Sequence, residues 1–174
     1  ALPISSDGEY AVGLWGSKAV IENNGEIVMN GDYSQGIMGT SQSNIVNNSI
    51  ITMNGNNSIG VILQSGVTNY VQSQIILNSP LELRGDESIG IQVANSTLDF
   101  TNSVVKLNIG TLGNDINSTG NITGNDVNYV ENATGIAINT AGTVNFDDYD
   151  VFLGSKAKSS VGILIQNGTA TLSN

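Results

Sequence analysis

The chain alternates short apolar runs with clusters of Gly, Asn, Asp and Ser. These runs are short, as in Ile27 to Met29, Ile37 to Gly39 and Val20-Ile21. Within the three-residue runs, the first and third positions face the same side, which is a period of two residues. Runs of this kind bounded by turn residues predict β-strands. No apolar run approaches the roughly 18 residues of a membrane-spanning helix. The pattern therefore predicts an all-β chain built from many short strands.

One phrase recurs along the chain and defines an internal repeat. It contains a glycine, an acid or amide, a free position, Ser or Ala, another free position, a second glycine and an aliphatic residue, as in Gly31 to Ile37. The second glycine anchors each copy, and the last two copies are weaker. These anchors are Gly13, Gly36, Gly60, Gly90, Gly135 and Gly162. They are 23, 24, 30, 45 and 27 residues apart, so the basic period is about 24 residues and the longer steps contain insertions.

Positions before the anchor repeat as well. Nine residues before it stand Ile4, Ile27, Ile51 and Leu81, and twelve before it stand Asn24, Asn48 and Asn78. A period near 24 with three short strands fits one coil of a right-handed parallel β-helix, whose strands pair with their equivalents about 4.8 Å away. We expect a single β-helix segment over residues 1–174, with about six to seven coils and inserted loops. Because neither end carries a polar cap, we expect it to continue in a longer solenoid.

Stacked coils place equivalent residues above one another. We therefore expect Asn24, Asn48 and Asn78 to form a ladder of amide hydrogen bonds at a turn. The glycines at the corners are expected to adopt positive φ, which costs glycine little. The Ser or Ala two residues before each anchor keeps a crowded corner small, and Gly60→Val is expected to disturb its own coil and both neighbours.

The amino-acid composition excludes several classes of partner and of chemistry. Fifteen acidic and five basic residues give a net charge of −10, which disfavours nucleic acid and anionic membranes as partners. The absence of Cys excludes disulfides and thiolate metal sites, and the absence of His removes the commonest general base and zinc ligand. We therefore expect no enzyme activity, no cofactor and no metal.

The longest step, between Gly90 and Gly135, exceeds the period by about 21 residues and predicts an inserted loop at residues 110–132. Long loops on rigid scaffolds often carry binding residues, although an insertion without a role is the alternative. The candidate contacts in this loop are Asn114, Asp115, Asn121, Asn125, Asp126 and Tyr129. A smaller insertion near residues 64–74 adds Tyr70 as an exposed candidate contact.

Other polar and aromatic residues have two interpretations each. The acids Asp147, Asp148 and Asp150 are oxygen ligands of the kind that Ca²⁺ prefers, and with Asp99 they resemble the carboxylates of polysaccharide hydrolases. The alternative, which we favour, is an ordinary solvated turn. Tyr10 and Trp15 are expected to pack at a coil edge rather than to stack on a sugar. An outward corner, rather than a metal stack, is expected for Glu9, Asp32, Asn56, Asp86 and Glu131.

The phrases Asn30 to Ile37 and Asn54 to Val61 resemble the passenger domains of type V autotransporters. The Asn- and Ile-rich style is similar to that of the large outer-membrane adhesins of fusobacteria. The resemblance implies a secreted β-helix held at the bacterial cell surface by a separate C-terminal β-barrel. It also implies adhesion to a protein or glycan on host cells or other bacteria, and it supplies no catalytic residues.

Three functions follow from these observations. The first is an adhesin segment, a stalk with loop-borne contacts. The second is a polysaccharide-active enzyme, whose acids would converge on one face, and the third is a pure spacer. We expect the segment to be monomeric, as part of a larger chain.

Overall fold

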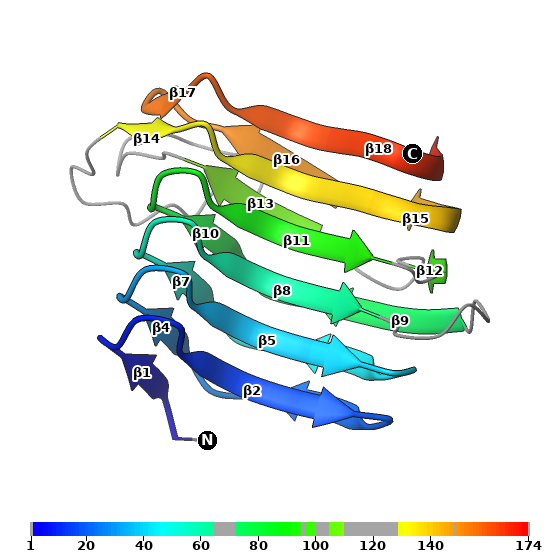
Figure 1. Ribbon diagram of the computed structural model, residues 1–174, viewed down its shortest axis with the longest axis horizontal. Helices are drawn as coiled ribbons and strands as arrows, with labels where there is room; N and C mark the ends of the chain where they lie inside the picture. The colour runs from blue at the N-terminus through cyan, green and yellow to red at the C-terminus, as the bar shows by residue number, and fades with distance from the viewer. Residues whose placement is uncertain are drawn as a thin grey trace.

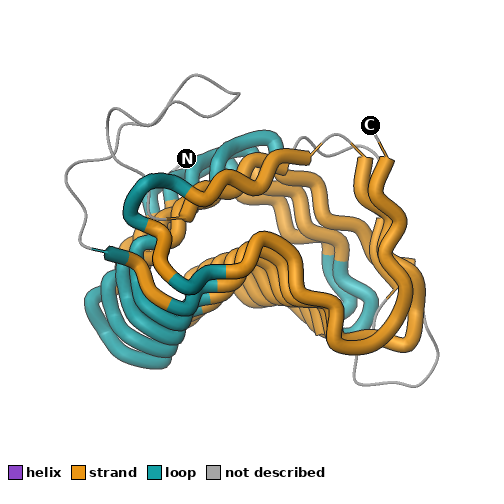
Figure 2. Tube along the Cα trace, turned by 90° about the horizontal axis from the view of Figure 1, so that it is seen from above, coloured by secondary structure: helices purple, strands orange, loops and turns teal. Residues whose placement is uncertain are grey.

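Parallel strands stacked into a β-solenoid make up this chain (Figure 1). The computed structural model describes residues 2–64, 72–94, 97–99, 105–109, 129–147 and 149–173. Those residues contain no helix. Seen from above, the coils superimpose and enclose a common interior (Figure 2). The prediction of an all-β parallel solenoid is therefore confirmed.

The first sheet contains six parallel strands, in the order β1-β4-β7-β10-β13-β16. These strands are β1 (Ile4–Ser6), β4 (Ile27–Met29), β7 (Ile51–Met53), β10 (Leu81–Leu83), β13 (Val105–Ile109) and β16 (Tyr149–Leu153). The pairing is parallel and in register, with Ile51 between Ile27 and Leu81. The residues nine before the first four anchors, Ile4, Ile27, Ile51 and Leu81, thus form a column, as the repeat predicts.

The second and third faces belong to one larger sheet. The second face is formed by β2 (Val12–Ser17), β5 (Gln35–Thr40), β8 (Ile59–Gln64), β11 (Ile89–Ala94) and the first parts of β15 (Thr134–Asp147) and β18 (Val161–Ser173). The third face is formed by β3 (Val20–Asn23), β6 (Asn44–Asn47), β9 (Gln72–Leu77), β12 (Thr97–Asp99) and the later parts of β15 and β18. A separate two-stranded sheet pairs β14 (Val130–Glu131) with β17 (Ala157–Lys158).

The number of coils differs from the six to seven predicted, since the solenoid has about four turns. Four coils, from β1 to β12, repeat the pattern of three separate short strands. Beyond them β15 and β18 each run without interruption across two faces. The prediction assumed one coil of the same kind for every anchor glycine. The strands that contain Gly135 and Gly162 instead each continue across two faces.

The core consists of aliphatic side chains and methionines that point inward from all three faces. Ile27, Met29, Ile51 and Met53 of the first sheet are 0% exposed. One coil alone leaves such side chains partly uncovered, so each is buried only when the next coil stacks on it. Burial of apolar surface between neighbouring coils is therefore the main source of stability.

The anchor glycines lie in single file, but the predicted positive φ at these positions is wrong. Among the described residues, Gly168 is the one glycine with positive φ. The left-handed residues at this corner lie three before each anchor and are Tyr10, Tyr33, Asn57, Glu87, Asn132 and Ser159. Close approach of the next coil explains the anchors, because a Cβ on Gly36 would lie 2.5 Å from the carbonyl oxygen of Gly60.

Candidate functional site

In the sequence, the predicted inserted loop follows Ile109 of β13, and the next described residue is Tyr129, directly before β14. Of the candidate contacts, Tyr129 lies within the described residues, and its side chain is 58% exposed. The other candidates lie outside the described residues, and they are Tyr70, Asn114, Asp115, Asn121, Asn125 and Asp126. Tyr129 therefore marks the position on the scaffold where the insertion ends.

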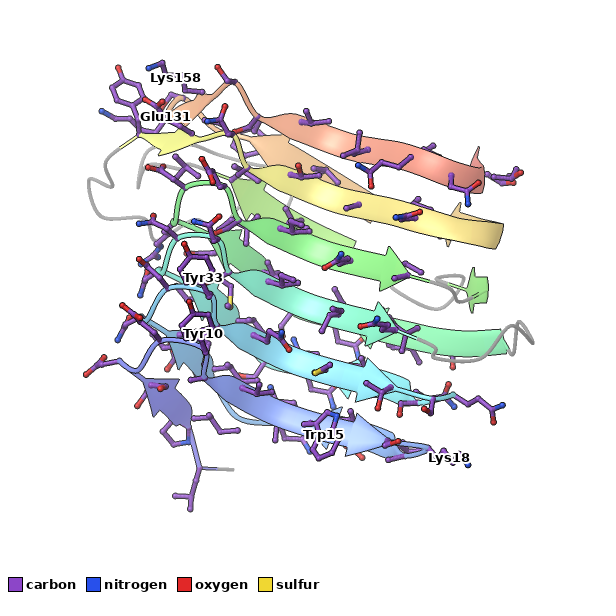
Figure 3. The ribbon with its side chains drawn as sticks, viewed as in Figure 1. Tyr10, Trp15, Lys18, Tyr33, Glu131 and Lys158 are labelled. Carbon is purple, nitrogen blue, oxygen red and sulfur yellow. The ribbon has the colours of Figure 1, made fainter. Side chains whose placement is uncertain are left out.

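Tyr129, Glu131, Lys156 and Lys158 form a cluster that we call the return corner. The amine of Lys156 lies 4.7 Å from the centroid of the Tyr129 ring, a cation–π arrangement. Lys158 Nζ donates a hydrogen bond to Glu131 Oε1 over 2.7 Å. The parallel register of β14 and β17 brings the second pair together, since Glu131 lies opposite Lys158 (Figure 3). An exposed ring and two ammonium groups thus meet where the insertion returns.

The return corner continues columns that begin in the first coil. Tyr129 and Lys156 lie six residues before their anchors, as do Asn30 and Asn54 in earlier coils. Asn54 Nδ2 donates to Asn30 Oδ1 over 2.7 Å, so an amide ladder occupies this column lower in the stack. A cation–π pair replaces the ladder beside the insertion. Alignment of the sequence on the anchor glycines places Tyr129 and Lys156 in the same column as Asn30 and Asn54. The column was not recognised because the residue type changes from Asn to Tyr and Lys.

The ion pair between Lys158 and Glu131 at the return corner shifts the pKa of Lys158. The hydrogen bond to Glu131, reinforced by the charge of its carboxylate, raises the pKa of Lys158 above the ordinary 10.5. A raised pKa means that folding favours the charged amine. The contribution of this ion pair to the free energy of unfolding is complete below the pKa that Lys158 has in the unfolded chain. It is lost as the pH rises through the raised pKa of the folded protein. Because the pair is exposed, its effect on stability is small.

We expect Glu131→Gln to lower the pKa of Lys158 toward its ordinary value, because the substitution removes the carboxylate charge. An NMR titration of the lysine side-chain signals measures this change. The signals of Lys18, which lies at the opposite end of the solenoid (Figure 3), serve as the internal reference. A Lys158 pKa that is the same in both proteins would contradict the ion pair.

The column of acids and amides four residues before the anchors lies at an outward corner, as the sequence predicts. Its side chains accept hydrogen bonds from the backbone of the next coil: Asn56 N–H donates to Asp32 Oδ1 over 2.7 Å, and Glu131 N–H donates to Asp86 Oδ1 over 2.8 Å. Within the described part of the chain, no three His, Cys, Asp or Glu residues are grouped to hold a metal. The observed role of this column is to join successive turns.

The predicted asparagine ladder is present. Asn48 Nδ2 donates to Asn24 Oδ1 over 2.8 Å, and Asn78 Nδ2 donates to Asn48 Oδ1 over 2.7 Å. A second asparagine pair, which was not predicted, is buried: Asn23 Nδ2 donates to Asn47 Oδ1 over 2.7 Å. The signal for it was the recurrence of Asn thirteen residues before the anchor.

Two aromatic side chains stack on each other in the first two coils of the solenoid. The Tyr10 and Tyr33 rings have centroids 5.0 Å apart and planes within 8° of parallel (Figure 3). Tyr10 is therefore packed against another ring and not isolated. Trp15 lies on β2 beside Met38 in the register and is 68% exposed, so its ring is not covered as expected.

The backbone separates the acids proposed for an enzyme. Asp99 on β12 pairs with Asn145, two residues before Asp147 on the neighbouring β15. Asp150 lies on β16 of the first sheet, opposite Lys106. Asp148 lies outside the described residues. Asp99 and Asp147 are thus on one face, and Asp150 is on another.

The outward side of the second face carries no charge, and we call it the neutral face. Its first column is Val12, Gln35, Ile59, Ile89, Thr134 and Val161. Its second column is Trp15, Met38, Ile62, Gln92, Ala137 and Leu164. The strands that form it lie side by side in Figure 1. Of the six, only β15 contains a charged residue, which is Asp147 at its far end.

No known protein family, curated protein or solved structure matches this chain. The fold places it among the parallel β-solenoids. The residues that the structure describes include no helix with the length and apolar character needed to cross a membrane.

Proposed function

We propose that the chain is part of a bacterial cell-surface adhesin, in which a β-solenoid stalk presents inserted loops to a protein or glycan. The partner would lie on host cells or on other bacteria. The proposal includes right-handed winding, the sense that nearly all parallel strand crossovers adopt. Secretion and attachment through a separate C-terminal β-barrel rest on the resemblance to type V autotransporters.

The observation that carries the proposal is the preserved register on both sides of the insertion. Before it, Leu107 of β13 pairs with Val151 of β16, and after it Glu131 pairs with Lys158. The solenoid thus accommodates the extra residues without losing alignment. A rigid scaffold that tolerates a long insertion is well suited to holding a binding loop.

The return corner supports contact with a partner at this position. Tyr129 is exposed, and its ring combines an apolar face with a hydroxyl group. Lys158 is also largely exposed, with 58% of its side chain accessible. Such residues suit contacts with glycan rings and with polar protein surfaces.

We expect replacement of residues 111–128 by a short Gly-Asn-Gly turn to reduce binding to the partner by at least about tenfold. Flow cytometry with epithelial cells, co-aggregation with other bacteria and a glycan array would measure binding of the whole chain. A matched control replaces Ser41-Gln42, the turn between β5 and β6, by Gly-Asn. Equal binding by all three proteins would contradict the proposal and favour a spacer.

The polysaccharide-active enzyme is tested separately. The Asp99 and Asp147 backbones lie on neighbouring strands of one face, so Asp147→Asn is the informative substitution. Release of reducing ends from a panel of polysaccharides by the whole chain, abolished in this variant, would support the enzyme. Under the adhesin proposal no release is expected.

A further inference from the structure

We propose that a second copy of this chain docks on the neutral face, so that two solenoids pack face to face. The inference does not depend on the adhesin proposal, because no residue of the inserted loop or the return corner takes part. Three properties of the neutral face favour a second copy as the partner: its lack of charge, its side-chain composition and its area.

Charge restricts how two copies approach. Each copy carries a net charge of −10, so most pairs of surfaces would bring carboxylates together. The neutral face differs from the rest of the molecule, because its twelve columnar positions include no acid and no base. Charges that lie off this face are screened over about 8 Å at physiological salt. Two copies therefore meet with least repulsion through this face.

The side chains of the neutral face have the composition of an interface. Ile59, Ile89 and Met38 are only partly buried within one chain, and Trp15 is exposed. Depletion of charge together with Met and aromatic residues is typical of the centre of protein interfaces. Contiguous apolar patches of this size on a protein surface commonly mark contact sites.

The area of the neutral face is sufficient for a weak dimer. Six strands spaced about 4.8 Å apart and about 20 Å long cover roughly 550 Å² per copy. Two copies would bury roughly 1,100 Å², slightly more than the 1,000 Å² or so expected of a specific contact. A face that pairs with itself by a two-fold axis needs no second complementary surface.

The test is the association of the whole chain, measured by sedimentation equilibrium. We expect a monomer–dimer equilibrium that strengthens with added salt, because carboxylates at the rim repel. Gln92→Glu keeps the shape of the side chain and places a charge on the neutral face. It is expected to weaken the dimer by at least about tenfold, since like charges across an interface are costly. Gln42→Glu, with the same chemistry on an exposed turn, is expected to leave association unchanged.

Circular dichroism checks that both variants fold. If Gln92→Glu does not fold, Gln64→Glu at the exposed rim of the same face repeats the measurement. A protein that stays monomeric at every concentration and salt, as the sequence led us to expect, would overturn the proposal. So would a dimer that Gln92→Glu and Gln64→Glu leave intact, because its contact would lie elsewhere.

Discussion

Gly55→Ala is expected to lower the free energy of unfolding by about 3 kcal/mol or more. A Cβ on Gly55 would overlap the carbonyl group of Gly31 in the coil below and lie 2.9 Å from the Asp32 nitrogen. These are backbone atoms, which move only if a whole coil moves. The substitution must therefore disturb the hydrogen bonds between two coils.

Gly8 provides the matched control for this prediction. It occupies the same column one coil beyond Gly31, where an added Cβ would meet nothing closer than the Ser6 hydroxyl at 3.6 Å. Gly8→Ala is expected to stabilise the protein slightly, by up to about 1 kcal/mol, because alanine restricts the unfolded chain. Urea unfolding followed by far-UV circular dichroism measures both. Equal effects would show that close approach does not explain the column.

Ile51→Ala is expected to destabilise the protein by about 3 to 4 kcal/mol. Ile51 is 0% exposed and lies in the first sheet between Ile27 and Leu81. Removal of its side chain leaves a cavity that the flanking coils cannot fill, because their positions are fixed by strand pairing.

The exposed residue Val20 is the control for the core. Val20→Ala is expected to change stability by less than about 0.5 kcal/mol, because this side chain is 73% exposed. Urea unfolding measures both variants. If the slope m of the free energy against urea concentration is the same in both, the difference between their midpoints reports the difference in stability. If the two substitutions had similar effects, the burial of the inward column would not be the source of stability.

The sequence predicted those features that stacking imposes on single positions. Equivalent residues lie over one another, so the column through Ile27 and Ile51 and the ladder through Asn24 and Asn48 could be read from spacing alone. The physical role of the anchor glycines could not. Both left-handed backbone and close approach of another chain segment require glycine, and spacing does not distinguish them.

The return corner was predicted only in part. Tyr129 was proposed as a contact, but its partner Lys156 was not, because the pair follows the 45-residue step that interrupts the period. The neutral face escaped notice for another reason. Its residues alternate with core residues, and only the strand register shows that the uncharged positions of six strands form one surface.

The direction of the hydrogen bonds between coils determines how this solenoid would respond to mechanical force. These bonds link equivalent strands in neighbouring coils, so tension along the stack pulls directly on them. A terminal coil shares them with one neighbour only, and unravelling would start there. Each regular coil of 24 residues would release about 80 Å of extended chain. The stack would thus lengthen in steps under load and absorb work before its interior coils separate.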